Sequence, residues 1–189
     1  MGHAQSLSRP LNLLKHDIRM GETQPLSVVK GGVFRDNCPF RAAQHPVHGL
    51  RFVQLADFAG HAATLLDWNK RTNLTRIVSP EGIAVRHFVD SLAVVPLLDG
   101  CKTVIDLGSG GGFPGLVLAA MMPESEIVLV DSVRKKVSFL MHLIRARQHQ
   151  RVVAVHARTT DLAAHPDYRK RFAAVVSRAM ADFEETVLA

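Results

Sequence analysis

The feature that most constrains this chain is a glycine-rich segment directly after a short, mostly apolar run. Five glycines stand between Gly108 and Gly115, immediately behind residues 103–107. A buried strand that runs into glycines and then into a helix lets the backbone turn sharply and approach a nucleotide without side chains in the way. Residues 103–115 therefore predict a strand, a tight turn and a helix that begins beside a ligand.

The rest of this half of the chain alternates apolar strands with helices. We expect strands at 103–107, 126–131, 152–156 and 172–177, and helices at 114–122 and 132–148. This order indicates βαβ units, so the fold class is α/β, with a mostly parallel sheet and helices on both faces. Ligands of such sheets bind at the carboxyl ends of the strands. The residues just after each strand are therefore the candidates for function.

The first 49 residues differ from the rest. They contain four prolines, a pair of glycines and no sustained apolar period, which is typical of loop-rich or disordered chain. We interpret 1–49 as an N-terminal extension and 50–189 as one domain. Within that domain, 50–92 should hold two leading helices and 103–189 the ligand-binding βαβ core.

Apolar residues at helical spacing predict the first leading helix, from Leu50 to about Trp68. The second should begin at Ser79-Pro80 and reach about Ser91, because serine caps a helix well and proline suits its first position.

Composition narrows the functional classes. With 47% hydrophobic and 21% charged residues, the chain is not disordered throughout. The longest apolar run, 113–122, has ten residues, too few to cross a bilayer, so no membrane partner is expected. Only two cysteines occur, hence no disulfide framework, and a reducing cytoplasm is the simplest location.

The positive charge is local. The chain carries +6 in total. Residues 132–178 contain eleven lysines and arginines against two acidic residues, whereas 1–131 is neutral. Such a stretch favours binding to the phosphates of a nucleic acid. A solvated helix face is the alternative interpretation.

Two ligand classes use a glycine turn of this kind. Gly110-x-Gly112-x-x-Gly115 matches the fingerprint of dinucleotide-binding enzymes, with Asp131 near the distance of a ribose-binding acid. A dinucleotide would place its pyrophosphate at the start of the following helix. Asp106 and Pro114 disfavour an anion there, since one adds a carboxylate and the other lacks an N–H. S-adenosylmethionine carries a sulfonium, an ammonium and no phosphate, so it fits this arrangement better than NAD.

Each acidic residue has two possible roles. Asp131 ends its strand and is expected to accept hydrogen bonds from both ribose hydroxyls, with capping of the next helix as the alternative. Asp106 is expected on the ligand side of the turn, with capping of the loop as the alternative.

Five motifs in a fixed order resemble one family, the ribosomal RNA small-subunit methyltransferase G family, also called glucose-inhibited division protein B. The resemblance covers residues 50–189. The motifs are Trp68-Asn69-Lys70 with Asn73-Leu74-Thr75, Arg86-His87 with Asp90-Ser91-Leu92, Asp106 to Gly115, Val130-Asp131-Ser132 with Lys135-Lys136-Val137 and Phe139-Leu140, and Val176-Ser177-Arg178-Ala179.

The resemblance implies a class I, Rossmann-like fold dependent on S-adenosylmethionine, and methylation of guanine N7 in bacterial 16S rRNA. Gly108 and Phe113 match cofactor positions in the glycine loop, beside Gly110, and Arg178 matches the family's cofactor-site arginine. The pair Thr159-Thr160 aligns with a contact near the adenine. There the chain departs from the family, which usually has glutamate where Thr160 stands; Asp161 could substitute.

Neither a catalytic side chain nor a metal is expected. Guanine N7 has an in-plane lone pair and needs no general base, and the ten histidines show no ligand spacing. RNA phosphates should contact Arg134, Lys135 and Lys136. The partner would be 16S rRNA or the small ribosomal subunit, and the protein a monomer.

The resemblance also leaves the final strands of the family fold unaccounted for, since four strands are expected here instead of seven. A truncated, catalytically silent homologue that binds cofactor or RNA only is therefore the alternative to an enzyme. The third functional interpretation is a nicotinamide-dependent oxidoreductase, which the glycine fingerprint alone would suggest.

Overall fold

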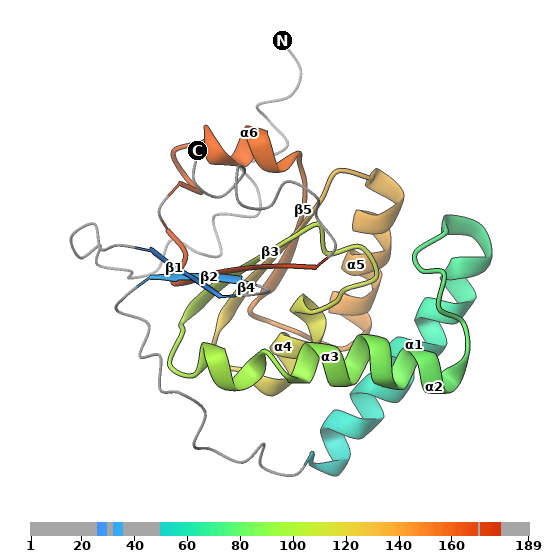
Figure 1. The fold of residues 1–189 in the computed structure, drawn as a ribbon. Helices are drawn as coiled ribbons and strands as arrows, with labels where there is room; N and C mark the ends of the chain where they lie inside the picture. Colours follow the sequence, from blue (N-terminus) through green and yellow to red (C-terminus); the bar gives the residue numbers. More distant parts are fainter. Residues whose placement is uncertain (1–25, 30–31, 36–49, 170, 179–189) are drawn as a thin grey trace.

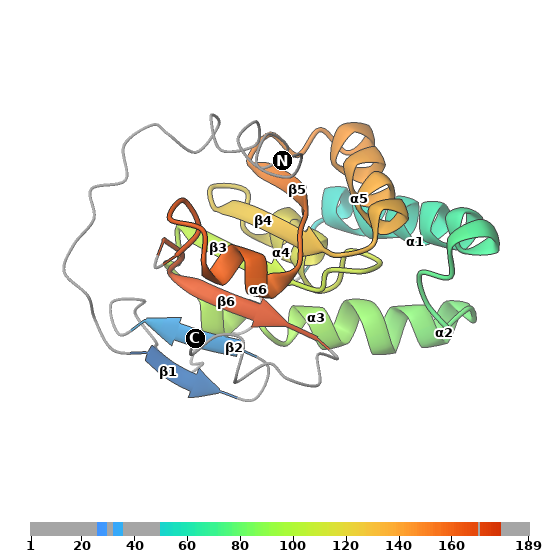
Figure 2. The ribbon, with the colours of Figure 1, turned by 90° about the horizontal axis from the view of Figure 1, so that it is seen from above.

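The computed structural model describes residues 26–29, 32–35, 50–169 and 171–178 (Figure 1). Within them lies one six-stranded sheet of order β1-β2-β6-β3-β4-β5. Four neighbouring strands of this sheet, β6, β3, β4 and β5, run parallel to one another, as Figure 2 shows from above. Their bounds are β3 Thr103–Leu107, β4 Glu126–Asp131, β5 Val152–His156 and β6 Ala174–Ser177. The expected α/β class with a mostly parallel sheet is confirmed.

Helices connect these strands and precede them. Helix α1 continues past Trp68, where the apolar spacing predicted its end, to Thr72. Asn73 ends it in the left-handed conformation, with φ 50°. The others match the expected segments within about two residues, and a short α6 follows β5. Their bounds are α1 Phe52–Thr72, α2 Pro80–Ile83, α3 Asp90–Leu92, α4 Gly115–Met121, α5 Arg134–Ala146 and α6 Thr159–Ala163.

The second leading helix is not uniform. Ser79 caps it as expected, accepting a hydrogen bond from Gly82 N at 3.1 Å. Between α2 and α3, however, residues Ala84–Val89 form a π-helix, and a 3₁₀ turn, Val95–Leu98, follows. A π-turn is rare and depends on tertiary contacts more than on propensity, so the sequence pattern did not reveal it.

The N-terminal extension, expected to be loop-rich or disordered over residues 1–49, contains a hairpin that the sequence did not predict. Strands β1 (Leu26–Val29) and β2 (Gly32–Arg35) pair with each other and, through β2, antiparallel to β6. Four-residue strands are too short to show a period, and their pairing partner lies far away in the sequence. The remainder of 1–49 lies outside the described residues.

One cysteine also changes the sequence interpretation. Cys101, buried just before β3, is disulfide-bonded. The small number of cysteines therefore gives no argument for a reducing compartment.

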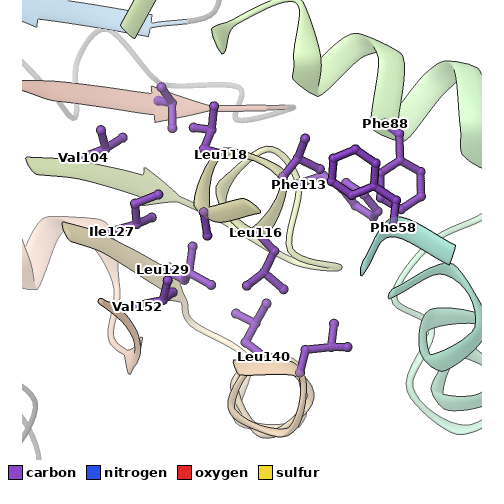
Figure 3. Packing of buried hydrophobic residues seen from close by; sticks show 14 of the residues in the cluster. Phe58, Phe88, Val104, Phe113, Leu116, Leu118, Ile127, Leu129, Leu140 and Val152 are labelled. Carbon is purple, nitrogen blue, oxygen red and sulfur yellow. The ribbon is translucent and has the colours of Figure 1, made fainter. Parts of the chain in front are cut away.

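Two apolar layers cover the sheet. On one face, α1, α4 and α5 pack over alternate strand residues such as Val104, Ile127 and Leu129 (Figure 3). On the other, Leu162 of α6 and Tyr168 pack over Ile105, Leu107, Val128, Val130 and Val155. Figure 1 shows α6 on one side of the sheet and α3 and α4 on the other. Helices on both faces leave the carboxyl edge of the parallel strands to the loops.

In the described part of the chain, no helix combines the length and apolar character that crossing a bilayer would require.

Candidate functional site

The loops after the four parallel strands meet at one edge of the sheet. Leu107 and Ser177 are register partners on β3 and β6, and Ser177 Oγ donates to Leu107 O at 2.8 Å. Asp131 and His156 are partners at the ends of β4 and β5. The expected ligand-side residues that follow these strands therefore share one edge.

The glycine turn is held by backbone hydrogen bonds to the neighbouring strand. Gly108 N and Ser109 N both donate to Val130 O at 2.9 Å. Gly108, Gly110 and Gly112 have φ of 74°, 54° and 86°, a region that favours glycine. The sequence thus contains three glycines where the turn needs positive φ, and Gly108 is solvent-exposed.

Asp106 lies beneath this turn and is fully buried. Its Oδ2 accepts a hydrogen bond from Gly115 N at 3.0 Å, so the carboxyl closes the loop at the start of α4. Oδ1 has no hydrogen-bond partner among the described residues. Burial raises the pKa of Asp106 to about 7, against the opposing effects of Ser109 and of the Gly115 N–H. These contacts correspond to the loop-capping alternative.

The start of α4 has no backbone donor to offer a phosphate. Gly112 N and Phe113 N both donate to Ser109 O, and Pro114 has no N–H. Gly115 N donates to Asp106, Leu116 N to Gly112 O and Val117 N to Pro114 O. A pyrophosphate needs free N–H groups at a helix start. The dinucleotide interpretation is therefore not compatible with this turn as it stands.

Asp131 closes the other side of the turn. Its Oδ2 accepts from Gly110 N at 3.0 Å and its Oδ1 from Val133 N at 2.8 Å. Each carboxylate oxygen has a further lone pair, so both expected roles are compatible with this geometry. Lys136 Nζ lies 3.9 Å from Asp131 Oδ2 and compensates the buried negative charge.

The ring of Phe113 lies between two imidazoles. His61 stacks on it at 4.5 Å between centroids and 7°, and His87 at 4.6 Å and 14°. Phe88 meets it edge to face. With 3% exposure, the Phe113 ring is a packing element, so only its main chain could contact a cofactor.

Arg178 follows β6 and lies over the same ring, with its Cζ 5.4 Å from the Phe113 centroid. Nη1 donates to Arg86 O at 2.7 Å and to Asp90 Oδ2 at 3.3 Å, and Nη2 donates to His87 Nδ1 at 2.8 Å. The structure thus brings Arg178 to the glycine loop.

Thr159 and Thr160 begin α6, one turn after the end of β5. Thr159 is half-buried and Thr160 exposed, as is Asp161. Ala157 N donates to Asp131 O at 3.3 Å, which ties this segment to the end of β4. The three residues therefore lie at the same edge as Asp131.

The basic residues Arg134, Lys135 and Lys136 form the first turn of α5, just beyond Asp131. Arg134 and Lys135 are exposed, whereas Lys136 is partly buried against Asp131. That turn contains no acidic residue. Cations at a helix N-terminus are unfavourable with respect to the helix dipole, so stability of α5 does not explain them.

Sequence reasoning missed several residues that shape the site. Ser109 Oγ donates to Asp106 O and accepts from Val130 N, and His61 Nε2 bonds Gly111 O at 2.7 Å. Burial lowers the pKa of His61 to about 4, so the ring is neutral and donates. A histidine at an apolar position of the first leading helix was the available signal. Among the described residues, no group of three or more His, Cys, Asp or Glu could hold a metal ion.

Comparison with known proteins agrees with the resemblance. A family model described as "rRNA small subunit methyltransferase G" matches residues 54–188. A protein of that name from Desulfitobacterium hafniense is 45% identical over 128 residues, which cover 68% of this chain and 53% of the relative. Another from Geobacter sulfurreducens is 46% identical over 125 residues, covering 66% and 57%.

A solved O-methyltransferase from Bacillus cereus in complex with SAH shares 20% identity, with 50% of this chain and 42% of that one covered and a TM-score of 0.39. That similarity is too small to bear on function. This chain spans between 53 and 61% of the length of the curated relatives it matches. The family model and the relatives together show that the chain belongs to the rRNA small subunit methyltransferase G family.

Proposed function

We propose that this protein binds S-adenosylmethionine at the carboxyl edge of its sheet and transfers the methyl group to N7 of a guanine in bacterial 16S rRNA. The observation that carries the proposal is the hydrogen bonding of the glycine turn. Its helix start is closed to phosphate, while Asp131 is bonded to Gly110. This arrangement suits a cationic nucleoside. The names of the matched relatives support the reaction and its RNA substrate.

The cofactor would be held mainly by three groups. Asp131 accepts hydrogen bonds from the ribose hydroxyls, and Gly108 and Gly110 allow close approach of the backbone. The Phe113 main chain contributes to the same wall. Asp106 shapes the turn from below, because it is fully buried and bonded to Gly115.

Further groups would complete the cofactor site. Thr159 and Thr160, which begin α6 at the same sheet edge as Asp131, would contact the adenine. Arg178 provides a guanidinium for the carboxylate of the methionine moiety, since such pairs form strong hydrogen bonds.

The reaction needs positioning more than acid or base catalysis. S-adenosylmethionine, when bound, supplies an electrophilic methyl group. Guanine N7 has a free lone pair, so no residue of this chain has to remove a proton. The protein therefore has to hold the base and the cofactor in line, and such alignment can supply much of the rate enhancement. This agrees with a site edge formed by glycines, carboxylates and a guanidinium.

RNA would approach along the first turn of α5. Arg134 and Lys135 are exposed there, beside Asp131, and can contact phosphates while the target guanine is splayed out of its stack. We propose 16S rRNA or the small ribosomal subunit as partner and the bacterial cytoplasm as location. That the protein is a monomer remains a prediction, which sedimentation would measure.

Cofactor binding is the first test. Calorimetry should show binding of S-adenosylmethionine and S-adenosylhomocysteine, and Asp131→Ala should weaken both by about tenfold or more. The control Asp99→Asn removes an exposed carboxylate before β3 and should bind as wild type. Unchanged binding by a folded Asp131→Ala variant would reject the site, and preferential binding of NAD would revive the oxidoreductase.

Methylation is the second test. Small ribosomal subunits lacking the modification would be incubated with labelled cofactor, and the labelled base identified. Incorporation at guanine N7 supports the proposal. Binding of cofactor without incorporation would favour the catalytically silent alternative.

A further inference from the structure

The guanidinium of Arg178 is held by three groups of one helical segment, residues 80–92. It donates to Arg86 O, Asp90 Oδ2 and His87 Nδ1. Since arginine has no acceptor, His87 Nδ1 must carry the lone pair in this contact. Among the described residues, the three bonds leave Nε–H and one Nη2–H of Arg178 without an acceptor. Two N–H groups thus stay available for a carboxylate.

The other ring nitrogen of His87 is also engaged. Nε2 lies 2.9 Å from Thr75 Oγ1. A neutral imidazole that accepts at Nδ1 carries its proton on Nε2, so His87 donates to Thr75. Burial and, next, the charge of Arg178 lower the pKa of His87, which favours this neutral form.

Thr75 itself is fixed by the turn after α1. Asn69 brackets it, with Oδ1 accepting from Thr75 N and Nδ2 donating to Thr75 O, both at 2.9 Å. Ile77 N donates to Thr75 Oγ1 at 3.0 Å. The Asn69 motif residue is therefore part of a capped turn, and that turn fixes the hydroxyl oxygen that faces His87 Nε2.

The π-helix brings His87 to this position. His87 and Phe88 are successive residues, yet both are buried and both contact the ring of Phe113. A π-turn is wider than an α-turn and often occurs at functional sites. It costs stability in isolation, and it lies in the segment that supplies the three hydrogen-bond acceptors of Arg178 found among the described residues. Its presence there calls for a functional reason.

We propose that His87 is a positioning residue for Arg178: held by Thr75 in its Nε2–H tautomer, it directs the guanidinium to the carboxylate of the cofactor's methionine moiety. The inference rests on the proposed function for the identity of that ligand. It predicts that the link acts on the amino-acid end of the ligand and leaves the adenosine end unaffected.

Two near-isosteric variants separate the ring nitrogens. The amide of His87→Asn reaches the place of Nδ1 and can accept from Arg178, whereas that of His87→Gln reaches the place of Nε2 and can contact only Thr75. Both lose the stacking on Phe113 to a similar degree. His142→Gln, at an exposed histidine of α5, is the control.

The readout compares S-adenosylhomocysteine with methylthioadenosine, which lacks the amino-acid end. His87→Gln and His87→Ala should weaken binding of S-adenosylhomocysteine by about tenfold or more. His87→Asn should recover most of that loss. Binding of methylthioadenosine should change less than about twofold in every variant. Equal losses in the Asn and Gln variants, or equal losses for both ligands, would overturn the inference, because either result indicates general packing.

A ligand-free measurement keeps the two proposals apart. NMR of the isotope-labelled imidazole should report Nε2–H in the wild type, and Thr75→Val should weaken that preference while Thr75→Ser keeps it. A wild type that binds neither ligand rejects the proposed function. An Nδ1–H tautomer rejects the positioning role, whatever the ligand results.

Discussion

The carboxyl group of Asp106 accepts a hydrogen bond from the backbone N–H of Gly115 at 3.0 Å while completely shielded from solvent. It joins the end of the first parallel strand to the first residue of α4. Because burial removes the carboxyl from water, and its second oxygen has no partner among the described residues, ionisation in the folded state is unfavourable. This explains why the pKa rises to about 7, and it makes folding dependent on pH.

Asp106→Asn should therefore gain stability relative to the wild type as pH rises. A carboxyl whose pKa is raised in the folded state stabilises fully below its unfolded value, near 4, and loses that contribution as pH approaches 7. The free energy of unfolding of the wild type should thus fall, relative to the variant, by about 4 kcal/mol over this window and no further above it. Chemical denaturation of both proteins from pH 4 to 8 measures the difference.

Only the difference between the two curves is informative. His61, with its pKa lowered to about 4, has the opposite effect. Its contribution to the free energy of unfolding decreases as pH falls below about 6.5, so the pH dependence of the wild type is flatter than Asp106 alone would make it. The Asn amide adds a constant cost that does not change with pH. The exposed Asp99→Asn control should run parallel to the wild type. A parallel curve for Asp106→Asn would mean that Asp106 is ionised in the folded protein.

Gly115→Ala should destabilise the protein by roughly 1–3 kcal/mol, as overpacking in cores does. An added Cβ would overlap Leu129 Cδ2 and lie 2.6 Å from Asp106 Oδ2. Leu129→Ala removes the first overlap, so the double variant should be more stable than the sum of the single changes predicts. Thermal or urea unfolding of the four proteins gives the coupling, and simple additivity would contradict the contact.

Gly60→Ala tests a second close approach, between α1 and the end of α5. Its Cβ would overlap the guanidinium of Arg147, which pairs with Asp57 at 3.6 Å. In the wild type the substitution should cost about 1 kcal/mol, since it displaces that contact. In an Arg147→Ala background it should stabilise by up to about 1 kcal/mol, because alanine is the better helix former. The same sign in both backgrounds would contradict this account.

The sequence predicted the parts of the fold that local patterns determine. Thr103–Leu107, Glu126–Asp131 and Val152–His156 form the strands expected of them, because buried parallel strands read as continuous apolar runs. The sequence pattern did not predict the hairpin of β1 and β2, since its pairing with β6 is a long-range contact. The glycine loop was found from its own sequence pattern, whereas Arg178 was found only through the resemblance.

The site could be predicted less fully. Asp106 was expected at the ligand and lies under the loop, because alternation on β3 turns it to the same face as Val104. The stacking of His61 and His87 on Phe113 depends on where α1 and the π-helix cross, which no local pattern encodes.

Removing the two exposed cations of the α5 N-terminus should weaken RNA binding without harming the fold. Arg134→Ala/Lys135→Ala should lower affinity for 16S rRNA fragments and reduce the slope of log affinity against log salt by up to about 2, roughly one per lost phosphate contact. Since cations are unfavourable at a helix N-terminus, stability should stay equal or rise by a few tenths of a kcal/mol.

A matched control tests whether position or charge matters. Lys102→Ala/Arg151→Ala removes the same charge from exposed residues before β3 and β5, at the amino edge of the sheet. Filter binding at several salt concentrations should leave this control near the wild-type slope, and cofactor affinity should not change in either pair. If both pairs reduced RNA binding equally, general charge and not the α5 turn would account for the attraction. If only the α5 pair does, RNA binds at the edge where Asp131 and the glycine loop lie, as transfer to an RNA base requires.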